Sequence, residues 1–325
     1  MPGRSATAIS HPNIAFIKYW GNRNAELRIP ANGSISLTLD GLQTTTTVQF
    51  DPGLELDQVS INDQPADPEP SDRITTHLDR IRALAKINTF AHVNSSNSFP
   101  SGAGIASSAS AFAALTVAAC AAASLELNPS ELSRLARKGS GSAARSIFGG
   151  FVELSTGDTD EQACAHQIAP ADHWDLIDVI AVIDTKHKLT GSTSGHSLAG
   201  SSPLQAARIE DAPRRLELCR RAIIDRDFEA LTTISELDSN MMHAIMMTSA
   251  PPLLYWLPGT LDIIHTIVDL RSQGVPVFYT IDAGPNVHCI CENQAMDDVI
   301  STIQALSAVQ YTLKASAGTE TRLRG

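Results

Sequence analysis

A lysine and a tyrosine end an apolar run near the start of the chain, in "NIAFIKYWGNRN" (residues 13–24). Burying an unpaired lysine is unfavourable, so Lys18 in this context predicts an anionic partner, with Asn13 and Tyr19 close by. The alternative is an edge strand from which the Lys18 ammonium extends into solvent. The segment alone leaves both interpretations open.

A single carboxylate interrupts another apolar run, "YTIDAGPNVHC" (279–289). Because a buried carboxylate is costly unless a cation pairs with it, Asp282 predicts a charged partner from elsewhere in the chain. The alternative is that its side chain caps the following Gly-Pro turn through an Asx-type hydrogen bond.

Glycines and serines fill "PSGAGIASSAS" (100–110), between a predicted strand and a predicted helix. Glycines let backbone N–H groups turn toward an anion, and the helix N-terminus adds roughly half a positive charge. The hydroxyls of Ser107 and Ser108 could then reach a phosphate or a Mg²⁺ ion. No Gly-Lys-Ser/Thr follows, so this is not a Walker A loop, and an ordinary turn is the alternative.

A second glycine-rich segment, "RKGSGSAARSIFGG" (137–150), contains Ser140, Ser142 and Arg145. The planar arginine fork matches a carboxylate or a phosphate. A capped helix with a surface arginine is the alternative.

The elements that must position these segments are mixed strands and helices. Strands are predicted at 34–50 (a strand or a hairpin), 91–99, 149–154, 175–184, 275–284 and 286–292. Helices are predicted at about 72–86, from the Gly-Ser loop to about 123, from an N-cap at Asn128 to Gly139, throughout 203–250, at 259–274 and at 295–308. Regular βαβ alternation is missing from this order, so the class is α+β, with a boundary between 185 and 200.

Composition restricts the classes of function. The chain has 325 residues, 43% of them hydrophobic, and a formal net charge of −11, which argues against nucleic acid or an anionic membrane as the partner. The stretch at 99–123 is mostly alanine broken by serine, which excludes a membrane span. Five cysteines without a CxxC pair, and no signal peptide, indicate a reduced, cytoplasmic protein.

The motifs together resemble one family. "NIAFIKYWG", "PSGAGIASSAS", "GSGSAARSIFGGF" and "DAGPNVH", supported by "MMHAIMM" and "PPLLYWLPGT", are similar to segments of the mevalonate diphosphate decarboxylases of the GHMP kinase superfamily. The resemblance implies a GHMP kinase fold, with a ribosomal-S5-like half at 1–185, a ferredoxin-like half at 186–325 and the site between them. It also implies ATP and Mg²⁺ as cofactors and a homodimer.

The same resemblance implies roles for individual residues. Asp282 would orient or deprotonate the substrate's 3-hydroxyl, Lys18 would keep it ionised and offset charge on the transferred phosphoryl group, and Arg145 would grip the substrate carboxylate. The remaining binding residues would be Asn13, Tyr19, Asn22, Ser140, Ser142 and Ser192 for the substrate, and Ser101, Gly102, Gly104, Ser107 and Ser108 for ATP, with Ser108 the candidate metal ligand.

The chain departs from the family pattern on the side that would bind the substrate's phosphates. Asn22 stands where the family has a second lysine, and in "KLTGSTSGH" (188–196) Gly191 replaces a serine and His196 a methionine. Losing a lysine from a diphosphate site predicts a monophosphate substrate, mevalonate 5-phosphate, giving isopentenyl phosphate. The alternative is mevalonate 5-diphosphate, with Arg23, Lys186 or Lys188 supplying the charge.

Other functions fit the same scaffold less well. A sugar or mevalonate kinase, a mevalonate 3-kinase that stops after phosphorylation, and an ATP-binding regulator with an inactive site are the alternatives. Asp282 and Arg145 in these contexts favour the decarboxylase, and no chemical position carries an inert replacement.

Overall fold

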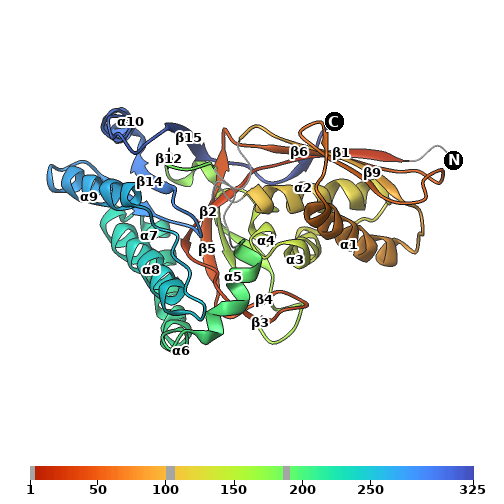
Figure 1. The fold of residues 1–325 in the computed structure, drawn as a ribbon, viewed down its shortest axis with the longest axis horizontal. Helices are drawn as coiled ribbons and strands as arrows, with labels where there is room; N and C mark the ends of the chain where they lie inside the picture. Colours follow the sequence, from red (N-terminus) through yellow and green to blue (C-terminus); the bar gives the residue numbers. More distant parts are fainter. Residues whose placement is uncertain (1–3, 100–106, 186–190) are drawn as a thin grey trace.

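The computed structural model describes residues 4–99, 107–185 and 191–325, and within them the strands form two large sheets and one short hairpin (Figure 1). The first sheet contains, in spatial order, β16 (Arg322–Leu323), β1 (Ser5–Ser10), β6 (Thr44–Phe50), β9 (Ala91–Asn97), β7 (Gln58–Ile61) and β8 (Gln64–Pro65). In β6 every second side chain is buried, as its alternating sequence "TTTTVQF" dictates for a sheet with one covered face.

Helices cover the buried face of the first sheet. They are α1 (Pro68–Ala85), α2 (Ser107–Ala122), α3 (Pro129–Gly139) and the single turn α4 (Ala143–Ser146). The small side chains of α2, mostly alanine, allow it to lie close against β1 and β6. The predicted N-cap is confirmed: Asn128 accepts from the Glu131 backbone, and the Glu131 side chain accepts from the Asn128 backbone, in a capping box.

The second sheet joins segments from both ends of the chain. Its order is β11 (Ala165–Ala169), β10 (Phe151–Leu154), β5 (Ser34–Asp40), β15 (Tyr311–Ala317), β12 (Leu176–Val182), β14 (Val287–Glu292) and β13 (Val277–Thr280), and β2 (Asn13–Ile17) also pairs with β5. Strand β15 pairs with β5 through Ser316 opposite Asp40 and Ala317 opposite Leu39. Strands β2 and β13, which lead to the predicted catalytic residues, therefore belong to one sheet.

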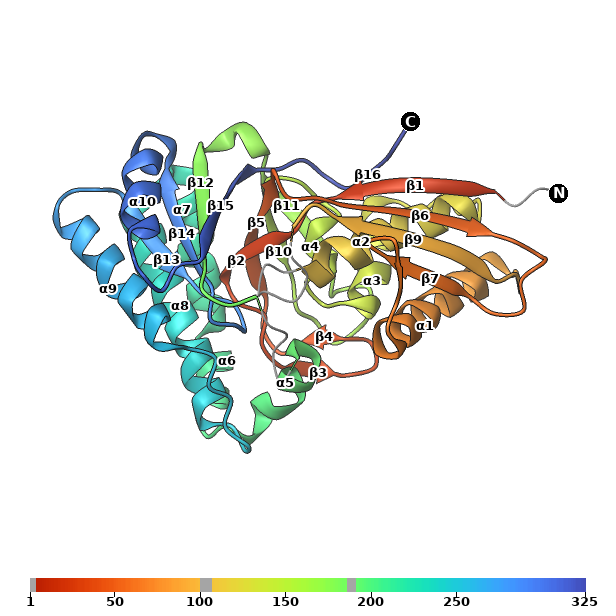
Figure 2. The same ribbon diagram turned by 45° about the horizontal axis from the view of Figure 1, so that its top comes forward.

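Longer helices pack on this second sheet. Helices α7 (Ala212–Asp225) and α8 (Phe228–Thr248) contribute to the core on one face, and α9 (Pro258–Ser272) and α10 (Met296–Gln304) to the core on the other. The hairpin of β3 (Asn22–Asn24) and β4 (Ile29–Pro30) lies beside α5 (Ser192–Leu198) in both views (Figures 1 and 2). The remaining elements are α6 (Gln205–Glu210) and the 3₁₀ turns η1 (Ala171–His173), η2 (Ala199–Ser201) and η3 (Asn293–Ala295).

The predicted α+β class is confirmed, but two element predictions are wrong. Residues 34–50 do not form a hairpin: β5 is buried on both faces within the second sheet, whereas β6 belongs to the first. Residues 203–250 are not continuously helical, because Arg226 adopts a positive φ of 55° and Asp227 caps a new helix through its bond to the Ala230 backbone. The sequence did not predict strands β1, β3, β4, β7, β8, β11, β15 and β16 or helices α4 and α5.

Candidate active site

Lys18 and Asp282 form the centre of the site. Lys18 follows β2, Asp282 lies just beyond β13, and the Lys18 Nζ is 2.6 Å from the Asp282 Oδ1. Lys18 is 1% exposed, whereas the Asp282 side chain is 27% exposed, so the carboxylate is the member of the pair that solvent or a substrate can reach. Burial lowers the pKa of Lys18, and the Asp282 charge opposes that shift. The predicted anionic partner is thus present, and the alternative of a solvent-directed lysine is wrong.

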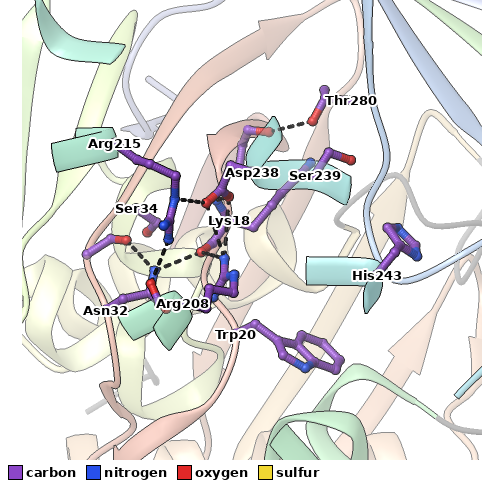
Figure 3. A network of polar contacts seen from close by, with 12 residues as sticks. Lys18, Trp20, Asn32, Ser34, Arg208, Arg215, Asp238, Ser239, His243 and Thr280 are labelled. Carbon is purple, nitrogen blue, oxygen red and sulfur yellow. Dashed lines mark hydrogen bonds and ion pairs between the residues drawn. The ribbon is translucent and has the colours of Figure 1, made fainter. Parts of the chain in front are cut away.

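A buried network fixes the backbone of Lys18 (Figure 3). The Lys18 N–H donates to Asp238 Oδ2 at 2.6 Å, and the Lys18 carbonyl accepts from Asn32 Nδ2 and from Arg208 Nη2, each at 2.9 Å. Arg215 Nε donates to the other Asp238 oxygen at 2.8 Å, and the side chains of Arg208, Arg215 and Asp238 are fully buried. The sequence prediction missed this network, which sets the direction from which the lysine side chain leaves.

Helix α8 also holds Ile281, the residue before Asp282. The Ile281 N–H donates to Ser239 Oγ at 3.0 Å, and the Ile281 carbonyl is 3.3 Å from His243 Nε2. Burial lowers the pKa of His243 to about 4, so its ring is neutral at physiological pH, and it stacks at 4.8 Å on Trp256. These contacts fix the backbone from which Asp282 extends.

Arg145 places a second cation near this pair. It is 3% exposed, so the alternative of a surface arginine is wrong. Its guanidinium donates to Ser36 Oγ at 2.9 Å, to Asn13 Oδ1 at 3.0 Å and to Ser34 Oγ, all uncharged acceptors. Burial lowers the pKa of Arg145 to about 10, while the Asp282 charge acts in the opposite direction. The guanidinium therefore stays protonated, with a positive charge that no contacting carboxylate neutralises.

The two glycine- and serine-rich segments converge through their hydroxyls. Ser108, in the first turn of α2, is 3.2 Å from Ser140, and Ser140 is 3.4 Å from Ser142, measured between the Oγ atoms. The family resemblance assigns Ser108 to ATP, and Ser140 and Ser142 to the substrate. Because these side chains are neighbours, the two predicted binding sites adjoin one another. Ser107 begins the same helix, whereas Ser101, Gly102 and Gly104 lie outside the described residues.

An aromatic stack stands at the predicted phosphate side. The Tyr19 hydroxyl donates to Asn22 Oδ1, the Gly21 N–H donates to His196 Nδ1 at 2.9 Å, and the His196 ring lies 4.3 Å from that of Tyr19 and 4.6 Å from that of Trp20. Burial raises the pKa of Tyr19 to about 12 and lowers that of His196 to about 3. The phenol and the imidazole are therefore both neutral, and Nδ1 of the histidine is an acceptor.

Glycines on two neighbouring segments make room for this stack. A Cβ at Gly141 would lie 2.1 Å from Cε1 of Tyr19, and one at Gly195 would lie 2.5 Å from the Trp20 ring. Only glycine permits both approaches, which explains the glycines of "GSGS" and "STSGH".

Three cations, Arg23, Lys186 and Lys188, are the candidates to replace the lysine that is missing at Asn22, and of these the structure describes Arg23. Arg23 forms an ion pair with Asp158, an exposed residue. Lys186 and Lys188 lie outside the described residues, and the side chain of Ser192, at the start of α5, is not described either.

The assembled groups suit chemistry on an anion. Within the described part of the chain, they are buried cations, a reachable carboxylate and adjoining hydroxyls, and no cluster of three or more His, Cys, Asp and Glu could hold a metal. The Ser108 hydroxyl, the predicted metal ligand, lies in the first turn of α2, and hydroxyl, phosphate and water oxygens are ligands that suit Mg²⁺. No helix among the described residues is long and apolar enough to cross a membrane.

Comparisons with known proteins cover nearly the whole chain. A family model described as diphosphomevalonate decarboxylase-like N-terminal domain matches residues 10–165, and one described as mevalonate 5-diphosphate decarboxylase C-terminal domain matches residues 178–322. The chain is 39% identical to a diphosphomevalonate decarboxylase from Candida albicans, over 92% of this chain and 87% of that protein. It is 34% identical to a phosphomevalonate decarboxylase from Haloferax volcanii, over 90% of each.

The fold has close counterparts among solved structures. One, described as MDDEF in complex with MVAPP, AMPPCP and magnesium, superposes with a TM-score of 0.93 at 36% identity, over 98% of each chain. MVAPP abbreviates mevalonate diphosphate, and AMPPCP is an analogue of ATP. The expected GHMP kinase fold is confirmed, whereas the division into halves at residue 185 stays a prediction.

Proposed function

The chain belongs to the diphosphomevalonate decarboxylase family, and we propose that it converts mevalonate 5-diphosphate and ATP into isopentenyl diphosphate, ADP, phosphate and CO₂. The family resemblance seen in the motifs is confirmed, and members of this family are ATP-dependent decarboxylases. The observation that carries the proposal is the 2.6 Å pair of Lys18 and Asp282, with the buried Arg145 charge beside it.

Phosphorylation of the 3-hydroxyl would use the Lys18–Asp282 pair. The exposed carboxylate is able to accept a hydrogen bond from the hydroxyl and to take its proton as the oxygen attacks the γ-phosphorus of ATP. Lys18 keeps Asp282 ionised, and its charge offsets the negative charge that develops on the transferred phosphoryl group. Breaking the bond between the β- and γ-phosphates releases ADP.

Decarboxylation would depend on Arg145. The C1–C2 bond of the phosphorylated acid breaks to release CO₂, and its electron pair forms the C2–C3 double bond as phosphate leaves C3. A buried guanidinium whose hydrogen-bond acceptors among the described residues are all uncharged attracts the substrate carboxylate and fixes its orientation. Ser34, Ser36 and Asn13 hold the Arg145 guanidinium in place through hydrogen bonds. The guanidinium therefore keeps its position while the carboxylate carbon leaves as CO₂.

ATP and Mg²⁺ are supported by the solved structure that contains an ATP analogue and magnesium. In this chain we assign the nucleotide phosphates to the start of α2, where Ser108 contacts Ser140. Bound magnesium would neutralise phosphate charge. The predicted homodimer and the predicted cytoplasmic location stay predictions.

The diphosphate replaces the monophosphate as the preferred substrate. The monophosphate prediction depended on Asn22, but relatives that are 37% and 39% identical to this chain are named diphosphomevalonate decarboxylase, and the bound substrate in the solved structure is mevalonate diphosphate. One relative, from Haloferax volcanii, is named phosphomevalonate decarboxylase. The monophosphate is therefore the substrate against which the diphosphate should be compared.

The test measures ADP and CO₂ in the same reaction. Purified protein with ATP, Mg²⁺ and each substrate is expected to release one CO₂ for each ADP, with a higher kcat/KM for the diphosphate. ADP without CO₂ would identify a 3-kinase instead. At least a tenfold preference for the monophosphate would reverse the substrate assignment.

A further inference from the structure

The hairpin of β3 and β4 carries a cation, Arg28, six residues after Asn22. We infer that Arg28 binds the terminal phosphoryl group of the substrate's diphosphate, in place of the lysine that Asn22 replaces. This inference rests on the proposed function. It extends that function by naming the residue that determines the preference for the diphosphate over the monophosphate substrate.

The backbone at Arg28 is fixed on both sides. Arg28 directly precedes β4 and adopts a positive φ of 49°, at the end of the turn that follows β3. The neighbouring Leu27 N–H donates to Asn24 Oδ1 at 2.8 Å, and the Leu27 carbonyl accepts from Arg137 Nε at 3.1 Å. A strained φ persists only where surrounding contacts impose it, so the direction in which the Arg28 side chain leaves the hairpin is set by the fold.

The guanidinium of Arg28 has no partner within the described residues, although the side chain is half-buried. Its neighbours differ: Arg23 on the same hairpin pairs with Asp158, and Arg137 pairs with Asp160. A partly buried cation without a counter-ion is unfavourable unless an anion arrives to pair with it. A substrate phosphate would supply that anion.

Arg28 lies on the hairpin that carries Asn22. In the register of this hairpin Asn22 lies opposite Pro30 and Asn24 opposite Ile29, so Arg28 directly precedes the strand that pairs with Asn22. Asn22 in turn accepts from the Tyr19 hydroxyl. In agreement with this position, the Arg28 charge acts to lower the pKa of Tyr19 and that of His196. The charge lost at Asn22 is therefore present again within the same hairpin.

Further cations surround the same position. The Arg28 charge lowers the pKa of Arg73 and of Arg80, both on α1, which shows mutual repulsion of like charges. Arg73 Nη2 donates to the Gly139 carbonyl at 3.4 Å, next to Ser140, and Arg73 Nε is buried without a hydrogen-bond partner. This positive edge adjoins the serine segment, and a doubly charged terminal phosphate would relieve the repulsion.

The central experiment replaces Arg28 with glutamine, which keeps an unbranched polar side chain but removes the charge. The variant is expected to lose about 10- to 100-fold in kcat/KM for mevalonate 5-diphosphate and less than about threefold for mevalonate 5-phosphate, because only the diphosphate carries the second phosphoryl group. The Michaelis constant should carry most of the loss, since this contact is distant from the reacting hydroxyl.

Arg23→Gln is the matched control, because it removes an exposed arginine from the same hairpin. Its kcat/KM should stay within about twofold of the wild type for both substrates. Adding Asn22→Lys to the Arg28→Gln variant should recover at least about tenfold for the diphosphate, since it returns a charge to the same region. Thermal melting of each variant separates loss of binding from loss of folding.

An equal loss for both substrates, or no loss for either, overturns the inference while the wild type still releases CO₂. If the wild type releases CO₂ from neither substrate, the proposed function fails instead. Calorimetry with inorganic pyrophosphate and with phosphate then tests Arg28 without turnover. At least a tenfold weaker pyrophosphate affinity in Arg28→Gln supports the inference, and an unchanged affinity refutes it.

Discussion

The two sides of the site are held by different kinds of interaction. Around Lys18 and Asp282, a fully buried ionic network and backbone hydrogen bonds from α8 fix the reacting groups. Around Tyr19 and His196, stacked neutral rings and glycine contacts shape the surface, and the charged member, Arg28, is half-buried and unpaired among the described residues.

This difference indicates which residues are free to change. A change in the ionic network leaves a buried charge without a partner, so each member depends on all the others. A change in the stacked region alters shape and local charge but strands no buried ion. Two of the three departures from the family pattern, Asn22 and His196, fall on the stacked side, and Lys18, Arg145 and Asp282 match the residue types that the family resemblance implies.

The largest effect is expected from Asp282→Asn. The amide accepts no proton and leaves Lys18 without a charged partner, so kcat should fall about 10³- to 10⁴-fold while ATP binding changes little. Steady-state CO₂ release and nucleotide titration measure the two quantities. Asp158→Asn, at an exposed aspartate, is the control and should retain full activity. A variant at 282 with near-normal turnover would remove Asp282 from the mechanism.

Asp238→Ala tests the ionic network itself. Arg208 and Arg215 would keep their buried charges without the shared carboxylate, so the free energy of unfolding should fall by about 3–5 kcal/mol. Urea denaturation measures it. Asp211→Ala removes a more exposed partner of Arg215 and should cost only about 1 kcal/mol. Equal losses of unfolding free energy in the two variants would show that the buried charge of Asp238 is no more important to stability than the more exposed charge of Asp211.

Gly141→Ala tests the stacked side. The new methyl group would meet the Tyr19 ring at 2.1 Å, so the ring must move, at a cost of about 1–3 kcal/mol in unfolding free energy. The KM for the phosphorylated substrate should rise more than kcat falls, because the reacting pair is held separately. Gly200→Ala, where nothing lies within 4 Å, should change neither quantity. A variant at 141 with unchanged KM would show that Tyr19 does not shape the substrate site.

The smallest effect concerns the protonation of His196. Its pKa is about 3 in the folded protein and about 6.5 in the unfolded chain, so between these values the unfolded chain binds the additional proton. The stability that depends on the neutral ring is complete above about pH 6.5 and is lost as the pH falls toward 3.

His196→Met removes this titration. Between pH 7 and pH 5.5 the wild type should lose about 1 kcal/mol more unfolding free energy than the variant does, as measured by urea denaturation at both pH values. Parallel losses would mean that the ring is protonated as readily in the folded protein as in the unfolded chain, so that it is not held as an acceptor for the Gly21 N–H.

Lys18 and Asp282 were predictable because each interrupts an apolar run. The cost of burying a charge predicts an oppositely charged partner for each of them, and the family resemblance implied that they lie close to one another. The residues that support them were not predictable. Asp238 occurs on a long helix among other polar residues, where a charge is typical of a solvated face, and only the tertiary packing shows that it is buried.

Local sequence patterns do not show which distant segments pack together. This limited the prediction of the fold and of the region predicted to bind the substrate's phosphates. Residues 34–50 have the pattern of a hairpin, but sequence does not show that β5 has both faces covered and β6 only one. Arg28 was overlooked because it lies in a polar turn, where an arginine carries no signal. Its significance comes from neighbours that belong to α1 and α5.

The position of β15 has a consequence for how the protein folds. This strand, residues 311–317, lies between β5 and β12, so the second sheet is incomplete until nearly the whole chain is present. Contacts over such sequence separations raise contact order and slow folding. Fragments that end before residue 311 would leave one edge of β12 unpaired over Ile177–Val182, together with Leu39 and Asp40 at the end of β5, and an unpaired edge is a template for aggregation. Truncation near the C-terminus should therefore lower soluble yield long before it removes any residue of the site.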